Sequence, residues 1–272
     1  MLMSMSIAER RTRFQELHAE GLFLLPNPWD VGSARLLEAR GFEALATTSA
    51  GLAWSLGRLD GSVTRAELVA HVAAVSEATT LPLNVDSERL FPDDPGGVAE
   101  TVRLLADAGA AGCSVEDWNP AEGRIDDVEV AVACVTAAAE AAHALPEPLT
   151  LTGRAENHIH GIDDLDDTIE RLLAYRDAGA DCVYAPGLRD LDRIRAVVEA
   201  VGVPVNVLAL AAGPSVAELA EAGVRRVSTG GALAGAAYGA LMAATDELLA
   251  SGTSSYAERN VTRKTLEGAF GG

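Results

Sequence analysis

The sequence predicts a closed (β/α)8 barrel formed by a single domain, residues 1–272. Three observations lead to this prediction. Eight short β-rich runs recur along the chain, segments with helical periodicity separate them, and several of these segments end in a glycine that can terminate a helix. Strands that alternate with helices pair in parallel through right-handed crossovers. The alternative is an open doubly wound sheet, but no GxGxxG sequence follows the first run to support it.

The eight predicted strands are separated by segments long enough for a helix. The strands lie at 22–26, 44–49, 81–86, 112–117, 149–154, 181–187, 203–209 and 225–231. An N-terminal helix is expected at about 5–20, and the alanine-rich segment 232–249 is expected to form the eighth barrel helix. A further helix at about 255–270 is one that the barrel does not require. Such an extra element commonly packs against a neighbouring subunit, which favours an oligomer.

Composition excludes several classes of partner. The sequence has 21 basic and 40 acidic residues, a formal net charge of −19. This charge repels phosphate backbones and anionic lipids, so neither nucleic acid nor a membrane is expected as a partner. No apolar stretch approaches the roughly 20 residues of a membrane span, and the first residues contain no hydrophobic core of signal-peptide length. The three cysteines have no metal-binding or redox spacing. We therefore expect a cytoplasmic protein.

Acidic residues gather at the ends of two neighbouring strands. Asp86 and Glu88 follow the third run, and Glu116 ends the fourth. In this fold the active site lies at the carboxyl ends of the strands, and residues two apart in an extended strand face the same side. Carboxylates held close together repel one another, and a hard cation such as Mg²⁺ relieves that repulsion. We predict a metal site here, with Asp60 holding metal-bound waters; solvated loop acids are the alternative.

Arg154 ends the fifth run at the same face of the barrel. A guanidinium can bind a substrate carboxylate through two parallel hydrogen bonds, so Arg154 is a candidate for substrate binding. An ion pair with one of the nearby acids is the alternative. Asn157, three residues further on, and Asn206 in the seventh strand are expected to serve the same ligand.

The loops after the first two strands offer further binding groups. Ser49, Ala50 and Gly51 are small, so their backbone amides can approach a substrate carboxylate closely. Trp29 and Asp30 follow the first strand and are expected to border the pocket. For Asp30, capping of the next helix is the alternative.

Several of these segments together resemble the isocitrate lyase and phosphoenolpyruvate mutase superfamily. They are LPNPWDVGSARLLEARGFEALATTSAG, Asp86-Ser87-Glu88, Val115-Glu116-Asp117, GRAEN and YAPGL, and the resemblance spans about residues 22–241. It implies a barrel that uses Mg²⁺, with Mn²⁺ as a substitute, to hold a 2-oxo acid or its enolate. It also implies a homotetramer, a dimer of dimers, in which subunits exchange a C-terminal helix.

The resemblance assigns roles to individual residues. Asp86 would be the direct metal ligand, and Asp60, Glu88 and Glu116 would act largely through water. The backbone amides of Ala50 and Gly51 would meet the substrate carboxylate. Arg154 would clamp the carboxylate or the oxo end of the substrate.

One loop departs from the pattern of the superfamily. After the fourth strand the chain reads DWNPAEGRIDD, without the Lys-Lys-Cys-Gly-His type of sequence with which the lyases cleave isocitrate or methylisocitrate. Neither of those activities is therefore expected. The mutases and phosphonopyruvate hydrolases carry lysine, asparagine and serine or threonine there. Only Asn119 remains in this chain, with Arg124 as a substitute cation.

The part that chelates a 2-oxo acid is intact. We therefore expect a Mg²⁺-dependent carbon–carbon lyase or decarboxylase that acts on a 2-oxo dicarboxylate, such as oxaloacetate or 2-oxoglutarate, through a metal-stabilised enolate. Arg154, Glu116 and Asn119 are its candidate catalytic residues. Two alternatives remain open: a mutase or hydrolase of phosphoenolpyruvate or phosphonopyruvate, and a non-catalytic protein that binds 2-oxo acids.

Overall fold

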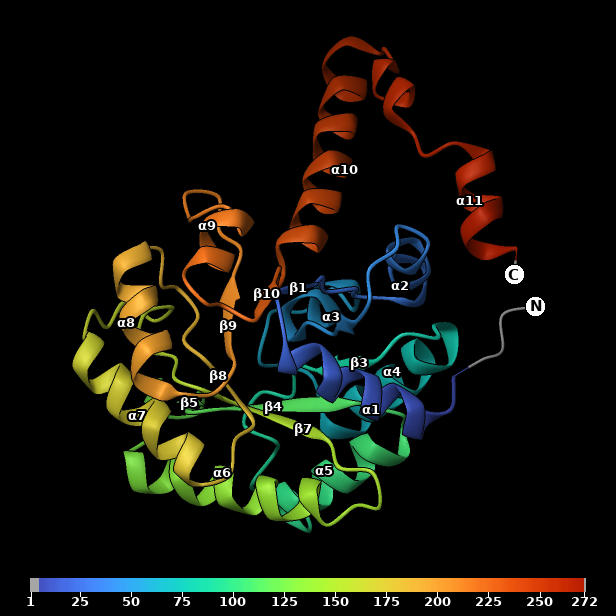
Figure 1. Ribbon diagram of the computed structural model, residues 1–272. Coiled ribbons are helices and arrows are strands. Elements are labelled where there is room, and N and C mark those ends of the chain that lie inside the picture. The colour runs from blue at the N-terminus through green and yellow to red at the C-terminus, as the bar shows by residue number, and fades with distance from the viewer. Residues whose placement is uncertain (1–4, 272) are drawn as a thin grey trace.

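The computed structural model describes residues 5–271, which form an eight-stranded parallel barrel surrounded by helices (Figure 1). The strand order is β1-β10-β9-β8-β7-β4-β3-β2. The backbone amide of Ala46 donates to the carbonyl of Pro26 at 3.1 Å, which joins the two end strands of this order. The strands are β1 (Phe23–Leu25), β2 (Leu45–Ala46), β3 (Leu83–Val85), β4 (Gly112–Glu116), β7 (Thr150–Arg154), β8 (Cys182–Tyr184), β9 (Val205–Leu208) and β10 (Arg226–Ser228). The predicted (β/α)8 barrel is confirmed.

Helices begin where the sequence supplies capping groups. The side chains of Ser6, Thr64 and Ser215 each accept a hydrogen bond from the backbone amide three residues on. In each case that residue is a glutamate, whose carboxylate accepts the backbone amide of the capping residue. The helices are α1 (Ile7–Ala19), α2 (Val31–Glu38), α3 (Ser49–Ser55), α4 (Arg65–Ala78), α5 (Gly97–Asp107), α6 (Val128–His143), α7 (Leu165–Asp177), α8 (Leu191–Val201), α9 (Val216–Glu221), α10 (Ala232–Ser251) and α11 (Arg263–Phe270), with a 3-10 turn η1 (Ser255–Arg259). Between residues 5 and 271, no helix combines the length and hydrophobicity that crossing a bilayer requires.

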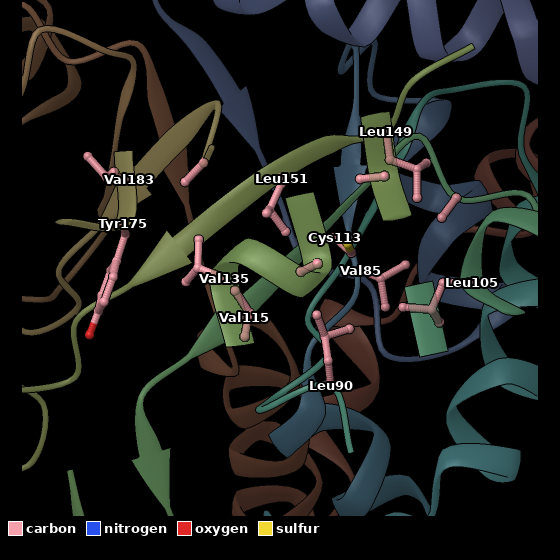
Figure 2. Packing of buried hydrophobic residues seen from close by; sticks show 14 of the residues in the cluster. Val85, Leu90, Leu105, Cys113, Val115, Val135, Leu149, Leu151, Tyr175 and Val183 are labelled. Carbon is pink, nitrogen blue, oxygen red and sulfur yellow. The ribbon is translucent and has the colours of Figure 1, made fainter. Parts of the chain in front are cut away.

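Alternation along the strands divides the core into two clusters. Residues on the outer face of the strands pack against the helices, as Figure 2 shows for Val85, Val115 and Leu151 beside Leu105 of α5 and Val135 of α6. The inner cluster is smaller and combines strand residues with two residues of α1: Phe14, Leu17, Phe23, Leu25, Ala44, Ala46 and Ala111. Helix α1 therefore covers the amino-terminal end of the barrel, and the carboxyl end is left open.

The C-terminal segment extends away from the barrel. Figure 1 shows α10 projecting from the barrel, after which the chain returns so that α11 packs against α2. The segment expected as one helix at about 255–270 is divided into η1 and α11. The division has a local cause: Asn260 is extended, and the side chain of Thr262 accepts the backbone amide of Thr265 and so begins a new helix.

Candidate active site

A cavity of about 200 Å³ opens at the carboxyl end of the barrel. Six of the predicted site residues line it: Ser49, Ala50, Asp60, Asp86, Arg154 and Asn206. They come from four different strands or the loops after them, so the fold brings together groups that are far apart in sequence. This is the end of a parallel barrel at which ligands bind.

Arg154 lies among three carboxylates. Its Nη1 is 2.6 Å from Asp86 Oδ1, its Nη2 is 3.0 Å from Glu116 Oε2, and its Nε is 2.9 Å from Glu156 Oε1. Its guanidinium carbon also lies 5.3 Å from the ring centroid of Tyr184. Burial alone would lower the pKa of Arg154, but the three carboxylates outweigh burial and raise that pKa well above its ordinary value. The structure thus shows Arg154 paired with nearby acids, which was the alternative to substrate binding, and it has three such partners rather than one.

One guanidinium does not neutralise all the acids of this region. The carboxylates that influence one another here are Asp60, Asp86, Glu88, Glu116 and Glu156. Burial and the charges of Asp86 and Asp60 raise the pKa of Glu88 to about 7. Burial also raises the pKa of Glu116 well above its ordinary value, against the opposing effect of Arg154. Loss of hydration and the charge of Asp86 raise the pKa of Asp60, although its side chain remains exposed.

These carboxylates form a suitable environment for a hard cation. All the candidate ligands are oxygen atoms, which Mg²⁺ prefers. Burial first, and then neighbouring carboxylates, raise the pKa values of Asp60 and Glu88, so a bound cation would relieve both costs. Within residues 5–271, no three His, Cys, Asp or Glu side chains form a ready-made metal cage. Magnesium usually binds through one or two carboxylates and keeps several waters. The arrangement therefore fits an ion bound directly by Asp86 and through water by the others.

Strand alternation, from which the position of Glu88 was predicted, does not place this residue. Strand β3 ends at Val85, so the alternation of an extended strand does not reach Glu88. Glu88 instead has a left-handed backbone, with φ of 49°, and its carbonyl accepts the backbone amide of Glu116 at 3.0 Å. This turn, which is rare for a residue other than glycine, brings the carboxylate near Asp86.

Because the pKa of Glu88 is raised, we predict that in the absence of metal the free energy of unfolding depends on pH. Between pH 5 and 7 the folded protein retains a proton that the unfolded chain has released, so this residue makes the folded state progressively less stable as the pH rises. We expect Glu88→Gln to become more stable than the wild type across this range, by about 2 kcal/mol at pH 8. Urea unfolding in EDTA at several pH values measures the difference. A difference that does not vary with pH would contradict the prediction.

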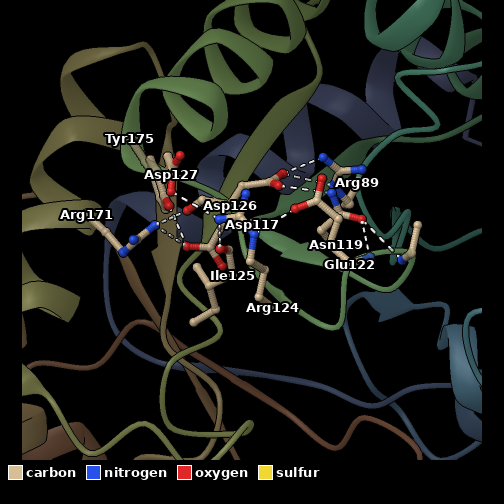
Figure 3. Close-up of polar contacts among 11 residues, drawn as sticks. Arg89, Asp117, Asn119, Glu122, Arg124, Ile125, Asp126, Asp127, Arg171 and Tyr175 are labelled. Carbon is tan, nitrogen blue, oxygen red and sulfur yellow. Dashed lines mark hydrogen bonds and ion pairs between the residues drawn. The ribbon is translucent and has the colours of Figure 1, made fainter.

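The loop after β4 folds into a hairpin of β5 (Trp118–Asn119) and β6 (Arg124–Ile125), which the sequence analysis did not predict. Asn119 is buried in it: its Nδ2 donates to Asp126 Oδ1 at 3.1 Å, and its Oδ1 accepts two backbone amides of the turn (Figure 3). Arg124 forms ion pairs with Glu122 and Asp127. The two candidates for phosphoryl binding are therefore occupied within their own hairpin, and neither lines the cavity.

Seven predicted residues lie outside the cavity lining: Asn119, described above, and Glu88, Glu116, Gly51, Asp30, Asn157 and Trp29. The amide of Gly51, predicted to meet the substrate, instead donates to Thr48 Oγ1 at 3.3 Å. Asp30 caps α2, since its Oδ1 accepts the backbone amide of Ser33 at 2.6 Å; this was the alternative for Asp30. The Nδ2 of Asn157 donates to Asp167 Oδ2 at 2.7 Å. Trp29 packs behind Gly51, where an added Cβ would come within 2.8 Å of Trp29 Cβ. Asp30 and Asn157 thus bind partners within the protein, and Gly51 cannot be enlarged without displacing Thr48 or Trp29.

Two buried acids of this region, Glu156 and Asp117, were not predicted from the sequence. Glu156 is 3% exposed and orients Arg154 through the Nε contact, while Asp117 is 1% exposed. Asp117 accepts the Glu156 amide at 2.9 Å, the Tyr175 hydroxyl at 2.5 Å and Arg171 Nη1 at 3.3 Å (Figure 3). A signal was present for Glu156, because it stands two residues after Arg154 in GRAEN.

Loss of the Asp117 carboxylate is expected to destabilise the protein strongly. In Asp117→Ala, Tyr175 and Arg171 lose a buried acceptor, and we expect the free energy of unfolding to fall by about 3 kcal/mol. The matched control is Asp127→Ala, which removes an acid from an exposed pair with Arg124 and should cost less than about 1 kcal/mol. Urea unfolding measures both. Equal effects of the two substitutions would show that the buried network contributes no special stability.

The chain is similar in sequence and structure to several known proteins. The family model of phosphoenolpyruvate phosphomutase matches residues 14–249. The crystal structure of a lyase/mutase-type protein from Burkholderia cenocepacia J2315 superposes with a TM-score of 0.92 at 50% identity, over 96% of this chain and 95% of that one. An uncharacterised protein of Mycobacterium tuberculosis H37Rv is 36% identical over 219 residues, 80% of this chain and 81% of its own. An oxaloacetate decarboxylase of Rhodopseudomonas palustris HaA2 is 29% identical over 211 residues, 70% of each chain.

Proposed function

Because this chain belongs to the phosphoenolpyruvate phosphomutase family, whose relatives include lyases and mutases, we propose that it is a Mg²⁺-dependent carbon–carbon lyase or decarboxylase of a small 2-oxo dicarboxylate. The observation that carries the proposal is the carboxylate cluster around Arg154, at the open end of the barrel and beside a cavity of ligand size. Oxaloacetate is the substrate that we would test first, since one relative is an oxaloacetate decarboxylase.

The metal site of the proposal uses acids that are already crowded. Asp86 would bind the ion directly, and Asp60, Glu88 and Glu116 would act through water. When bound, Mg²⁺ or Mn²⁺ supplies an electron sink that lowers the barrier to forming an enolate next to the oxo group. Burial and mutual repulsion make these carboxylates costly to hold ionised, and a bound cation would offset that cost.

Arg154 and the loop after β2 would bind the substrate. Asp86 accepts both the Ser49 amide and Arg154 Nη1. A cation that competes for Asp86 would release these donors, and both would then face the substrate carboxylate. Glu156, which has no role in metal binding in this proposal, would keep Arg154 in place through Nε. The amide of Ala50 lies beside Ser49 in the cavity lining and would add a further donor.

The hairpin favours this reaction over phosphoryl chemistry. Asn119 and Arg124 already have partners in and next to the hairpin, so either would have to give up those partners to bind a phosphoryl oxygen. Loss of CO2 from oxaloacetate breaks the bond between the carbon next to the oxo carbon and the distal carboxylate, and the electron pair of that bond forms the enolate. This step requires little more than an electron sink and a group that binds the other carboxylate. A non-catalytic role in binding 2-oxo acids would use the same groups, and only turnover separates the two.

The test is a substrate panel with purified protein and Mg²⁺. We expect release of pyruvate from oxaloacetate above the rate with Mg²⁺ alone, and loss of that excess on addition of EDTA. Turnover of phosphonopyruvate instead would favour the mutase or hydrolase. Binding of 2-oxoglutarate in a thermal-shift assay, without turnover of any member of the panel, would favour the non-catalytic binder.

We propose further that the protein is a homotetramer built through its C-terminal segment, in which α11, packed here against α2 of its own chain, is exchanged between subunits. Leu241, Met242, Leu248 and Leu249 recur at helical spacing on one side of α10, and their side chains are 48% to 87% exposed. Light scattering is expected to give four subunits for the wild type and fewer for Met242→Glu. Glu258→Ala, outside this face, serves as the control. A monomeric wild type would contradict the proposal.

A further inference from the structure

The interior of the barrel is unusually polar on one side. Bulky branched residues commonly fill the interior of this fold. In this chain the inward positions of six strands instead carry buried small or polar residues: Asn84, Gly112, Ser114, Thr150, Thr152, Cys182, Asn206, Arg226 and Ser228. The cavity of the candidate site extends among them, since Asn84, Ser114, Asn206, Arg226 and Ser228 contribute to its lining. A polar chamber therefore lies beneath the carboxylate cluster.

Arg226 is a buried cation, and no acid among residues 5–271 forms an ion pair with it. It is 2% exposed, and its Nε donates to Asn206 Oδ1 at 2.9 Å and its Nη2 to Thr152 Oγ1 at 3.0 Å. Its Nη1 lies 3.2 Å from His18 Nε2. Because His18 Nδ1 lies 2.7 Å from the carbonyl of Phe14, Nδ1 carries the proton and Nε2 accepts. Burial, and then the charge of Arg226, lower the pKa of His18 to about 3, so the imidazole is neutral.

The guanidinium still has unused donors. It carries five N–H groups, and its hydrogen bonds in the described part of the chain use three of them, all with neutral partners. One N–H on each terminal nitrogen remains. Burial of a charge that has no counter-charge is costly, so an anion beside Arg226 would stabilise the folded protein.

Strand register connects Arg226 to the mouth of the cavity. Arg154 pairs with Tyr184, Tyr184 with Asn206, and Asn206 with Arg226, so these residues form one row across β7, β8, β9 and β10. The row runs from the carboxyl end of β7 to the amino end of β10. The cavity is thus lined by one arginine at its mouth and another at its floor.

The cavity has room for a ligand beside Arg226. Asn84 also lines it, is 5% exposed, and has an amide oxygen that finds no hydrogen-bond partner among residues 5–271. Because this oxygen is an acceptor, it requires a donor such as water and does not itself bind a carboxylate. The volume of about 200 Å³ is several times that of one water, which occupies roughly 30 Å³.

We propose that Arg226 and Asn206 form a second anion subsite in the barrel interior, which binds the distal carboxylate of a 2-oxo dicarboxylate held at its other end by Arg154. The inference rests on the proposed function and adds the residues that would recognise its substrate class: a dicarboxylate is preferred to a monocarboxylate because only the former has a second carboxylate for Arg226 to bind. Arg226 would be a determinant of specificity. It takes no part in metal binding.

The test compares two ligands that differ in the distal carboxylate, 2-oxoglutarate and pyruvate, by calorimetry in the presence of Mg²⁺. We expect the wild type to prefer 2-oxoglutarate, and Arg226→Gln to weaken 2-oxoglutarate binding by about 10- to 100-fold with pyruvate affected less than about threefold. Arg226→Lys keeps the charge and serves as a second variant if the glutamine variant does not fold; we expect it to retain part of the preference.

Arg11→Gln is the matched control. Arg11 is also buried, at 7% exposure, but it donates to the backbone carbonyls of Ala106, Ala110 and Glu147. Its loss should lower stability and leave the ratio of the two affinities unchanged. If the wild type binds both ligands and neither Arg226 variant changes that ratio, the subsite is refuted and the proposed function stands. If the wild type binds neither ligand, the proposed function fails and the subsite fails with it.

Discussion

Replacement of Asp86 by alanine is expected to abolish Mg²⁺-dependent binding of 2-oxo acids while leaving the protein about as stable as the wild type. Asp86 is the proposed direct ligand, so its loss removes the ion and with it the substrate. Stability should be preserved because the charge of Asp86 raises the pKa of both Glu88 and Asp60, and removal of one crowded acid relieves that repulsion. Arg154 retains Glu116 and Glu156 as partners.

Calorimetry with Mg²⁺ and 2-oxoglutarate measures binding, and urea unfolding measures stability. The matched control is Asp60→Ala. Since Asp60 is proposed to act through water, its loss should weaken the metal by about 10- to 100-fold without abolishing binding. Binding by Asp86→Ala at the wild-type affinity would remove this residue from the metal site.

Replacement of Arg154 by alanine is expected to affect both binding and stability. Loss of the two-point contact with the substrate carboxylate should weaken ligand binding by about 2 to 4 kcal/mol. The substitution also leaves Glu116 and Glu156 without their cation. We therefore expect the free energy of unfolding to fall by about 3 kcal/mol at pH 8. The loss should be smaller at pH 5, because burial raises the pKa of both carboxyls and protonation removes the repulsion.

Arg154→Lys separates the two roles. A lysine keeps the positive charge among the carboxylates but cannot form the planar two-point contact. We expect stability close to that of the wild type and a ligand affinity between those of the wild type and Arg154→Ala. If Arg154→Ala loses stability but binds 2-oxoglutarate as tightly as the wild type, Arg154 is a structural ion-pair partner only.

The barrel could be predicted because its signal is repeated eight times along the chain. Each strand is short, yet the regular alternation with helices compensates for the weakness of any single run. The placement of Asp86, Glu116 and Arg154 followed from the same rule, since all three stand at carboxyl ends of strands. The rule was sufficient for residues whose positions depend on one strand alone.

Other parts of the site depend on contacts between residues far apart in the sequence, or on backbone turns that no sequence pattern indicates. The hairpin of β5 and β6 has strands of two residues each, too short to produce an alternating pattern, and its stability comes from distant groups such as Arg89, which pairs with Asp126. Glu88 reaches the cluster through a left-handed turn that its own sequence does not indicate. The role proposed for Arg226 rests on the register of four strands, which the sequence does not give.

The proposed function requires that the carboxylate cluster bind a divalent cation and that this cation bind a 2-oxo acid. A crystal of the wild type grown with Mn²⁺ and oxalate, measured at the manganese absorption edge, tests this claim most directly. We predict one anomalous peak bound by Asp86, with oxalate coordinated to the ion and contacting Arg154. A cavity without anomalous signal at millimolar Mn²⁺, with Arg154 still paired to Asp86 and Glu116, would contradict the account.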